Sequence, residues 1–384
     1  MNRLKVLHII SVDKQNYYLK NLKENSDSAR VEYSFVTLAP ESCDFVTDFA
    51  QKGWQVYGLD ALKRKSYPRA FFQLSKLIKS IDPDIVHTHL FDASLFGLTV
   101  AKMQKRKTVL TRHHSDAIHE IGSTVKRCFY LALEKYLSHL SDRIIAPSKM
   151  VRDFLVEKEG VADEKVAIIP YGQTTERFDA ITGDKIAAIR NELGMNGQLS
   201  IVNVSRLYRR KGHKYLFEAF SSLVRDGLNA RLYLVGDGDF RSELETMCIS
   251  LGIADKVNFV GWRDDALAIV AAADIIVHPS LEDALSSAVI ESVMLEKPIV
   301  ATDISGVRDS LGDGKYGLIV PPADAANLHK ALKETIGNFD CATQRSREGR
   351  TYLLEYMNAK RVAAEYEACY AGLVQKADEH SSRR

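Results

Sequence analysis

The sequence predicts an α/β protein built from two doubly wound domains. With 384 residues the chain is long for one hydrophobic core, so its length favours two domains. Short apolar runs alternate with longer amphipathic stretches, which is the pattern of buried parallel strands separated by helices. The pattern restarts after the polar segment TTERFDAITGDK. We therefore expect two domains that join near residues 172–182 and face each other across a cleft.

The first domain is expected over residues 1–175 and the second over residues 176–358. In each, the short apolar runs are predicted to form one parallel sheet. The strands predicted in the first domain are 5–11, 33–38, 55–58, 85–89, 108–112, 143–147 and 166–170. Those predicted in the second are 199–204, 231–236, 257–261, 275–279, 298–302 and 317–320. No strand follows the last helical stretch, so we expect residues 359–384 to pack back on the first domain.

Composition excludes several classes of protein. A net charge of +2, with 46% apolar and 27% charged residues, is typical of a globular chain and not of a disordered, collagen-like or nucleic-acid-binding one. No apolar run approaches the roughly 20 residues of a membrane-spanning helix, and no long apolar core with a cleavage site follows the first residues. Five cysteines without a CxxC pair predict neither a disulfide framework nor a cysteine metal site. We therefore expect a cytoplasmic protein.

Two basic residues follow the first predicted strand of the second domain. Arg206 and Lys211 lie in SRLYRRKG, between that strand and a helix expected to begin near His213. Ligands bind beyond the carboxyl ends of parallel strands, and helix N-termini attract anions, so this loop predicts an anion site with phosphate as its natural ligand. The alternative is a solvated basic turn without a specific ligand.

A second polar loop follows the predicted strand 275–279. It carries Asp283, and a helix that contains Glu291 is expected to begin at Ser286 or Ser287. Free amides at the helix start suit a diphosphate, while the two carboxylates can accept hydrogen bonds from sugar hydroxyls. Alternatively, Asp283 only caps a loop and Glu291 is an exposed helix residue.

Together these segments resemble the retaining GT-B glycosyltransferases of family 4, also called glycosyl transferases group 1. SRLYRRKG is similar to the family's G-R-L-x-x-x-K-G segment, EDALSSAVIE to its E-x7-E region, and YGLIVPPAD to its closing G-L-L-V-P-P-x-D. LYLVGDGD resembles its strand followed by glycines, and DIVHTHLFD and VLTRHHSD resemble two histidine segments of its first domain. The resemblance covers nearly the whole chain and is strongest over residues 199–324. It implies two Rossmann-like domains.

The resemblance assigns roles to single residues. Arg206 and Lys211 match the pair that neutralises the donor diphosphate, and Glu291 matches the carboxylate that holds the ribose hydroxyls. Asp283 stands where the family has the first glutamate of E-x7-E, near the transferred sugar. His113 matches the first-domain histidine that approaches this sugar across the cleft.

Further residues complete the implied site. The expected donor-binding residues also include Ser286, Ser287, Gly236 and Arg263, the last of which follows a strand near the expected place of the base. The expected acceptor-side residues are Lys14, Gln15 and His114. His87 and His89 end a strand, and simple packing there is the alternative to binding.

The chain also departs from the family pattern. Asp283 is one methylene shorter than glutamate, and Ala284, Leu285 and Ser286 replace family glycines. We expect backbone strain where such a position needs an angle that only glycine adopts easily. The glycine-rich loop after the first strand is replaced by SVDKQNYY. Donor preference is therefore expected to differ from that of other members.

The implied reaction moves a sugar from a nucleoside diphosphate to an acceptor hydroxyl, with retained anomeric configuration. A lipid-linked or cell-envelope glycan is the expected acceptor, and charge on the leaving diphosphate would be stabilised by the basic loop. We expect no metal and no other cofactor, since the sequence has no H-E-x-x-H spacing and no D-x-D segment before a recognisable divalent-cation loop. Two alternatives stay open: a nucleotide-sugar epimerase, and a nucleotide-sugar-binding protein without catalysis.

Residues 63–81 predict a membrane-facing helix. They contain six Lys or Arg and no acidic residue. In the helix expected over 69–81, one face is apolar and the opposite face carries Arg69, Phe72, Lys76 and Lys79. A basic face with an aromatic suits anionic lipid headgroups, so we expect peripheral contact with an anionic membrane. The alternative is a solvated basic face on an ordinary sheet-packing helix.

Overall fold

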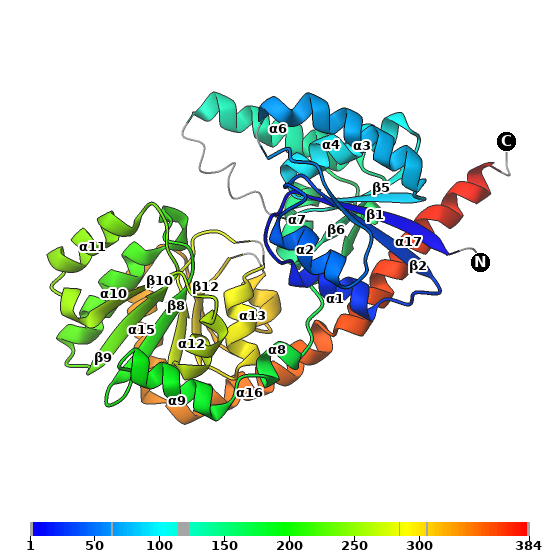
Figure 1. The fold of residues 1–384 in the computed structure, drawn as a ribbon. Helices are drawn as coiled ribbons and strands as arrows, with labels where there is room; N and C mark the ends of the chain where they lie inside the picture. Colours follow the sequence, from blue (N-terminus) through cyan, green and yellow to red (C-terminus); the bar gives the residue numbers. More distant parts are fainter. Residues whose placement is uncertain (1–2, 63, 114–122, 284, 305, 382–384) are drawn as a thin grey trace. The chain divides into compact units, whose positions relative to one another are not determined.

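The computed structural model describes residues 3–62, 64–113, 123–283, 285–304 and 306–381. The chain divides into two units (Figure 1). Unit 1 comprises Met1–Gln173 and Met357–Arg384, and unit 2 comprises Thr174–Tyr356. Each unit is built around one parallel sheet with helices between its strands.

Unit 1 contains a seven-stranded parallel sheet in the order β3-β2-β1-β4-β5-β6-β7. The strands are β1 (Leu4–Ile10), β2 (Val31–Thr37), β3 (Val56–Gly58), β4 (Ile85–His89), β5 (Lys107–Thr111), β6 (Arg143–Ala146) and β7 (Val166–Ile168). The helices between them are α1 (Tyr17–Asn25), α2 (Asp44–Gln51), α3 (Tyr67–Ile81), α4 (Phe91–Met103), α6 (Thr124–Leu140) and α7 (Lys149–Glu157). The chain direction across the sheet reverses between β1 and β4, which is where doubly wound sheets bind ligands.

The two faces of this sheet bury separate hydrophobic clusters. Alternation along β1 places Val6 and Ile10 in one cluster and Leu7 and Ile9 in the other. The C-terminal helix α17 (Ala359–Ser381) joins the first cluster through buried residues that include Tyr366. The hydroxyls of Tyr366 and Tyr18 also lie 2.6 Å apart, which ties α17 to α1. The helix without a following strand thus packs on unit 1.

Unit 2 repeats the plan with a six-stranded parallel sheet in the order β10-β9-β8-β11-β12-β13. The strands are β8 (Leu199–Val204), β9 (Ala230–Val235), β10 (Val257–Gly261), β11 (Ile275–His278), β12 (Ile299–Thr302) and β13 (Leu318–Val320). The helices are α8 (Glu176–Asp179), α9 (Gly183–Glu192), α10 (His213–Arg225), α11 (Arg241–Ser250), α12 (Ala266–Ala272), α13 (Ser287–Met294), α14 (Val307–Ser310), α15 (Ala325–Gly337) and α16 (Phe339–Tyr356). Here the direction reverses between β8 and β11.

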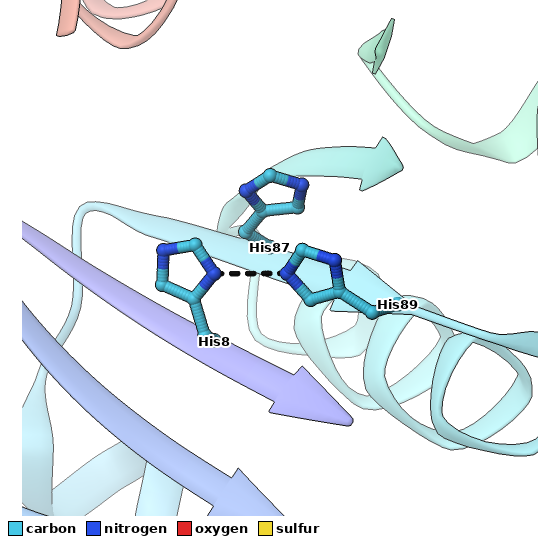
Figure 2. Close-up of side chains that lie close together, drawn as sticks. All are labelled: His8, His87 and His89. Atoms are coloured by element: carbon cyan, nitrogen blue, oxygen red, sulfur yellow. Dashed lines mark hydrogen bonds between the residues drawn. The ribbon is translucent and has the colours of Figure 1, made fainter. Parts of the chain in front are cut away.

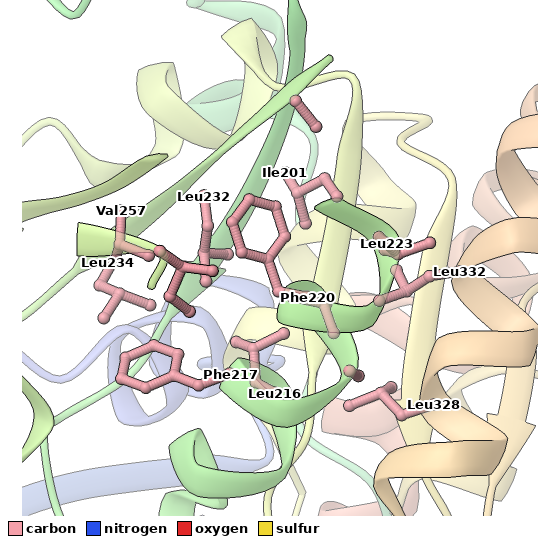
Figure 3. Close-up of a cluster of buried hydrophobic side chains, with 14 of the residues drawn as sticks. Ile201, Leu216, Phe217, Phe220, Leu223, Leu232, Leu234, Val257, Leu328 and Leu332 are labelled. Carbon is pink, nitrogen blue, oxygen red and sulfur yellow. The ribbon is translucent and has the colours of Figure 1, made fainter. Parts of the chain in front are cut away.

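A single large cluster forms much of the core of unit 2 (Figure 3). The cluster brings together Phe217 and Phe220 of α10, Ile201 and Leu232 of the sheet, and Leu328 of α15. All five side chains are at most 1% exposed. Burying such side chains gains roughly 1.5–3 kcal/mol each, so this packing holds the strand ends of unit 2 in place.

The predicted α/β architecture is confirmed. Each of the thirteen predicted strands is present, with bounds within two residues of those expected. The helices expected near His213 and at Ser286 or Ser287 begin at His213 and Ser287. Among the described helices, none combines the length and the apolar character needed to cross a membrane.

Candidate functional site

The loops of unit 2 meet at the carboxyl ends of β8 and β11. The Asn203 side-chain amide of β8 donates to the Val277 carbonyl of β11 at 2.9 Å, which joins the two strand ends. Beyond β8, the Leu207 amide donates to the Asp237 carbonyl at 3.0 Å. Beyond β11, the Leu281 amide donates to the Arg210 carbonyl at 2.7 Å. These main-chain bonds bring the two polar loops of the sequence to one edge of the sheet.

Arg206 and Lys211 share a loop but differ in their surroundings. Arg206 is exposed, and within the described residues its guanidinium makes no hydrogen bond or ion pair. Lys211 is buried, and its Nζ donates to Oδ2 of Asp283 at 2.9 Å. One cation is therefore open to a ligand, and the other is held in place by a carboxylate.

Asp283 lies between Lys211 and a histidine that the sequence did not single out. Nε2 of His278, at the end of β11, lies 3.6 Å from the same Oδ2. Burial alone would raise the pKa of Asp283, but the His278 imidazole and the Lys211 ammonium hold this pKa well below its usual range. The carboxylate is therefore ionised and fixes the direction of Lys211. Only the position of His278 at a strand end, before Pro279 and Ser280, could have indicated it.

Helix α13 presents its N-terminus at the same edge. Ser286 precedes it as the N-cap and is 4% exposed, yet its hydroxyl does not accept a hydrogen bond from a helix amide. Ser287, the first helical residue, is exposed. The first amides of α13 therefore lack the usual side-chain cap, which suits an anion.

The strain expected where glycines are replaced is absent at the described residues of this turn. Asp283, Leu285 and Ser286 have no positive φ, and Ala284 lies outside the described residues. At those three positions ordinary side chains fit because the backbone stays in regions that all residues adopt.

Glu291 points from α13 toward α8. Its Oε1 accepts a hydrogen bond from the Arg177 guanidinium at 3.0 Å, and its side chain is 17% exposed. Burial raises the pKa of Glu291, and Arg177 opposes this rise. Glu291 is therefore a largely buried, paired residue, and not the exposed helix residue of the alternative interpretation.

Two glycines allow the loops to approach closely. A Cβ on Gly236, which has φ +133°, would lie 2.1 Å from the Ser205 carbonyl oxygen. A Cβ on Gly212, with φ +70°, would lie 1.9 Å from the Pro279 carbonyl oxygen. Gly236 thus has a steric role beside the loop that carries Arg206.

Arg263 is already satisfied by carboxylates. Its guanidinium bonds to Asp265 through Nε and Nη2 at 2.8 Å each, and Nη1 bonds to Glu192 at 2.5 Å. These bonds raise the pKa of Arg263. The arrangement links α9 to the start of α12, so we leave Arg263 out of the proposed donor site.

In unit 1 the residues at the carboxyl ends of β1, β4 and β5 form a neutral aromatic network. His113 follows β5, is half-buried, and bonds through Nδ1 to the Tyr171 hydroxyl. Its Nε2 lies 3.5 Å from Nδ1 of His89. His89 and His87 are fully buried, as the packing alternative expected, and both are hydrogen-bonded.

His8, His87 and His89 come close enough to suggest a metal site (Figure 2). Their nitrogens lie within 4.8 Å of one another. However, Nδ1 of His8 and Nε2 of His89 are hydrogen-bonded at 2.9 Å, and both nitrogens of His87 bond to Tyr370 and Thr111. Two nitrogens on a tetrahedral zinc ion, each about 2.0–2.1 Å from it, would lie farther apart than 2.9 Å. The observed geometry is that of a hydrogen-bonded cluster.

The expected acceptor-side residues lie after β1. Lys14 Nζ pairs with Asp44 at 3.0 Å and Gln15 accepts from the Tyr17 hydroxyl at 3.3 Å, and both side chains are exposed. His114 lies outside the described residues. Neither Lys14 nor Gln15 contacts the His113 network through these bonds.

Two helices of unit 1 expose basic and apolar side chains. On α3, Ala70, Leu74 and Ile78 are buried while Arg69, Lys76, Lys79 and Phe72 are exposed, Phe72 by 67%. On α6, the exposed apolar residues are Val125, Phe129 and Tyr136, and Lys126 and Lys135 beside them are also exposed. Both helices pack against α4, side by side in Figure 1. The sequence pattern predicts the exposed basic face of α3 but not that of α6.

Comparison with known proteins agrees with this architecture. Residues 15–177 match the family model Glycosyltransferase Family 4, and residues 185–351 match Glycosyl transferases group 1. The uncharacterized glycosyltransferase MJ1069 of Methanocaldococcus jannaschii is 28% identical over 318 residues, which is 80% of this chain and 78% of that protein. The UDP-Gal:alpha-D-GlcNAc-diphosphoundecaprenol alpha-1,3-galactosyltransferase of Escherichia coli is 26% identical over 270 residues, 69% of each chain.

A solved structure extends the likeness to the whole fold. Anabaena Alr3699/HepE in complex with UDP and glucose matches with a TM-score of 0.81 and 18% identity, covering 96% of this chain and 100% of that chain. This similarity shows the GT-B fold with its two Rossmann-like domains. Since the two family models together span both units, the chain belongs to the group 1 glycosyltransferases of family 4.

Proposed function

We propose that unit 2 binds a nucleoside diphosphate sugar and that the protein transfers the sugar, with retained configuration, to an acceptor hydroxyl. One observation carries this proposal. The Arg206 guanidinium, unpaired among the described residues, the directed Lys211 ammonium and the first amides of α13 lie at the carboxyl ends of β8 and β11. Three kinds of phosphate-binding group at one sheet edge favour a diphosphate site over the alternative, a solvated basic turn without a ligand.

The charges also suit the chemistry of the leaving group. Breaking the glycosyl–phosphate bond adds negative charge to the diphosphate, so Arg206, Lys211 and the α13 amides would stabilise the transition state more than the ground state. In this proposal Asp283 keeps Lys211 aimed at the diphosphate, and its shorter side chain serves that pairing. These groups supply the positive charge, and we propose that no metal ion or other cofactor takes part.

The remaining donor contacts are proposed for the nucleoside and the sugar. Glu291 would accept hydrogen bonds from ribose hydroxyls, with Arg177 holding its carboxylate in place. His113 of unit 1 is proposed to serve the transferred sugar, and unit 1 to bind the acceptor. The UDP bound to HepE supports a nucleotide sugar donor. The name of the Escherichia coli relative includes a diphosphoundecaprenol-linked substrate, which supports a lipid-linked acceptor.

A thermal-shift screen tests this proposal. UDP, GDP, ADP and their sugars are added in turn, and we expect one nucleotide series to stabilise the protein, by about 2.7 kcal/mol at 100 times its Kd. Product analysis with that sugar then separates the alternatives. A glycoside of retained configuration supports transfer, release of an altered sugar indicates an epimerase, and tight binding without turnover on any acceptor indicates a binding protein.

We also propose that unit 1 contacts an anionic membrane through α3 and α6. The support is the exposed mixture of basic and apolar side chains on two helices of one layer, where each basic residue near an anionic surface contributes about 1 kcal/mol. Changing Lys65, Lys76 and Lys79 to Glu should abolish sedimentation with phosphatidylserine vesicles. Vesicle binding that survives this change would reject the α3 surface.

A further inference from the structure

A continuous chain of hydrogen bonds runs through unit 1 from β1 to His113. Nδ1 of His8 and Nε2 of His89 lie 2.9 Å apart (Figure 2), and the two rings are inclined by only 12°. Nδ1 of His89 lies 3.5 Å from Nε2 of His113, and Nδ1 of His113 bonds to the Tyr171 hydroxyl. Three imidazoles and one phenol are thus linked in order, with each ring using both of its nitrogens except at His8.

The rings of this chain are neutral. Burial lowers the pKa of His8 to about 3 and that of His113 to about 4, and burial with neighbouring imidazoles holds the pKa of His89 well below its usual value. A neutral imidazole has one N–H and one lone pair. If one ring donates through one nitrogen it must accept through the other, so all three rings point their hydrogens the same way along the chain.

The end of the chain decides this direction. Nε2 of His8 is buried without a hydrogen-bond partner in the described structure. If the hydrogens pointed toward His8, this nitrogen would be a buried N–H without an acceptor; in the opposite direction it is a lone pair without a donor. Orphaned buried N–H groups are rarer in proteins than under-satisfied acceptors. The favoured order is His8 Nδ1–H to His89, His89 Nδ1–H to His113, and His113 Nδ1–H to Tyr171.

We propose that His8 and His89 are positioning residues that fix His113 as the Nδ1–H tautomer, with its Nε2 as a hydrogen-bond acceptor. At 3.5 Å the contact from His89 is at the limit of a hydrogen bond, so a substrate hydroxyl that donates a shorter bond can take its place at the lone pair of His113 Nε2. Toward the substrate, His113 then accepts a hydrogen bond from a hydroxyl group and does not donate one. This role in catalysis rests on the proposed function, whereas the tautomer itself does not.

The test uses nitrogen-15 NMR of the full chain with labelled histidine. The chain has 11 histidines, and single substitutions assign their signals. We expect His8, His89 and His113 of the wild type, without substrate, to carry their hydrogens on Nδ1. Nε2–H tautomers at His89 and His113 would overturn the proposal.

Two variants on the same strand separate positioning from packing. His89→Phe keeps a buried ring but breaks the chain, so His113 should lose its single tautomer and kcat should fall about tenfold, the effect of one lost neutral hydrogen bond, with KM for the donor unchanged. His87→Phe is the matched control, because His87 is equally buried but bonds to Tyr370 and Thr111 outside the chain. It should leave the His113 signals unchanged and kcat within about twofold.

Two variants at His8 serve as the test if His89→Phe does not fold. His8→Asn keeps an N–H donor near the place of Nδ1, so His113 should stay in the Nδ1–H form. His8→Leu removes this donor, and we expect it to fold and to weaken the preference of His113 for the Nδ1–H form. Equal changes of the His113 signals in His87→Phe and His89→Phe would overturn the proposal. If the tautomers are as expected and no sugar is transferred to any acceptor, the proposed function fails and the positioning of His113 stands.

Discussion

At the carboxyl ends of their central strands, unit 2 places charged groups where unit 1 places neutral rings. In unit 2 these are Arg206, Lys211 with Asp283, and Glu291 with Arg177. In unit 1 they are the imidazoles that lead from His8 to His113 and the phenol of Tyr171. In the proposed function, one architecture thus carries two kinds of recognition. A diphosphate needs permanent cations that are kept in place by counter-ions, whereas a hydroxyl group needs neutral partners with a defined donor and acceptor.

The largest effect is expected from removing Lys211. Lys211→Met should lower transfer by about 10²–10³-fold, because a cation aimed at the leaving group is lost. It should also lower the free energy of unfolding by about 2 kcal/mol, because Asp283 loses its partner in a largely buried place. Initial rates and urea unfolding measure the two effects.

A double variant separates them. Lys211→Met with Asp283→Leu should regain most of the stability, since an apolar pair replaces the buried ions, but none of the transfer. Normal transfer in either variant would mean that the charged loop of unit 2 is only structural.

The next effect concerns Glu291. Glu291→Gln should raise the KM for the donor by about 10- to 100-fold, the effect of hydrogen bonds to a charged group. Arg177→Met is the comparison, because it leaves the Glu291 carboxylate but removes the guanidinium that is paired with it. It should raise the KM for the donor by less. If both variants behave alike, Glu291 acts only through its ion pair.

Acid should affect the two units over different pH ranges. The imidazoles of unit 1 are neutral when folded, with pKa values of about 3 for His8 and about 4 for His113, whereas an unfolded histidine has a pKa of 6.5. Below pH 6.5 the unfolded chain therefore binds more protons, and unit 1 loses about 1.4 kcal/mol per pH unit for each such histidine. Asp283 has a lowered pKa, so its contribution to unit 2 is lost only as the pH falls below 3.8.

Hydrogen exchange resolved by peptide measures this difference. Among the described residues, one histidine of unit 2 has a lowered pKa, the buried His213 at about 4, against four histidines of unit 1. Between pH 7 and pH 5, peptides of β1, β4 and β5 should lose protection before those of β8 and β11. The reverse order would contradict the neutral state of the unit 1 network.

The smallest effect is expected at Arg263. Its guanidinium is engaged by Glu192 and Asp265, so Arg263→Gln should leave donor affinity unchanged and cost less than about 1 kcal/mol of stability. A clear loss of nucleotide affinity would return Arg263 to the donor site.

Much of the fold follows from local sequence pattern. Each strand is a short apolar run between turn residues, and α17 has an amphipathic pattern with no strand after it, so its docking on earlier elements could be expected. The positions of Arg206, Lys211, Asp283 and the start of α13 at one edge also follow, because parallel strands end at the same side of a sheet.

The pairing of side chains could not be predicted in this way. Lys211 and Asp283 are 72 residues apart, and His8 and His89 are 81 residues apart. Whether a charged group meets a ligand or a counter-ion depends on where side chains from separate elements come together. Arg263 was predicted to bind the donor because its pairing with Glu192, 71 residues away, is not evident from the sequence. His8 is a single histidine within a strand, and nothing in the sequence indicated its role.

Calorimetric titration of the wild type and Arg206→Gln, with the nucleoside diphosphate that stabilises the protein most, tests the diphosphate site most directly. The Arg206 guanidinium has no bond within the described residues, so its replacement should change the free energy of unfolding by less than about 0.5 kcal/mol. The affinity should fall by about 10- to 100-fold, as expected for the loss of a charge-assisted hydrogen bond. Equal affinities in the two proteins, or no binding of any nucleoside diphosphate to the wild type, would contradict the assignment of this edge of unit 2.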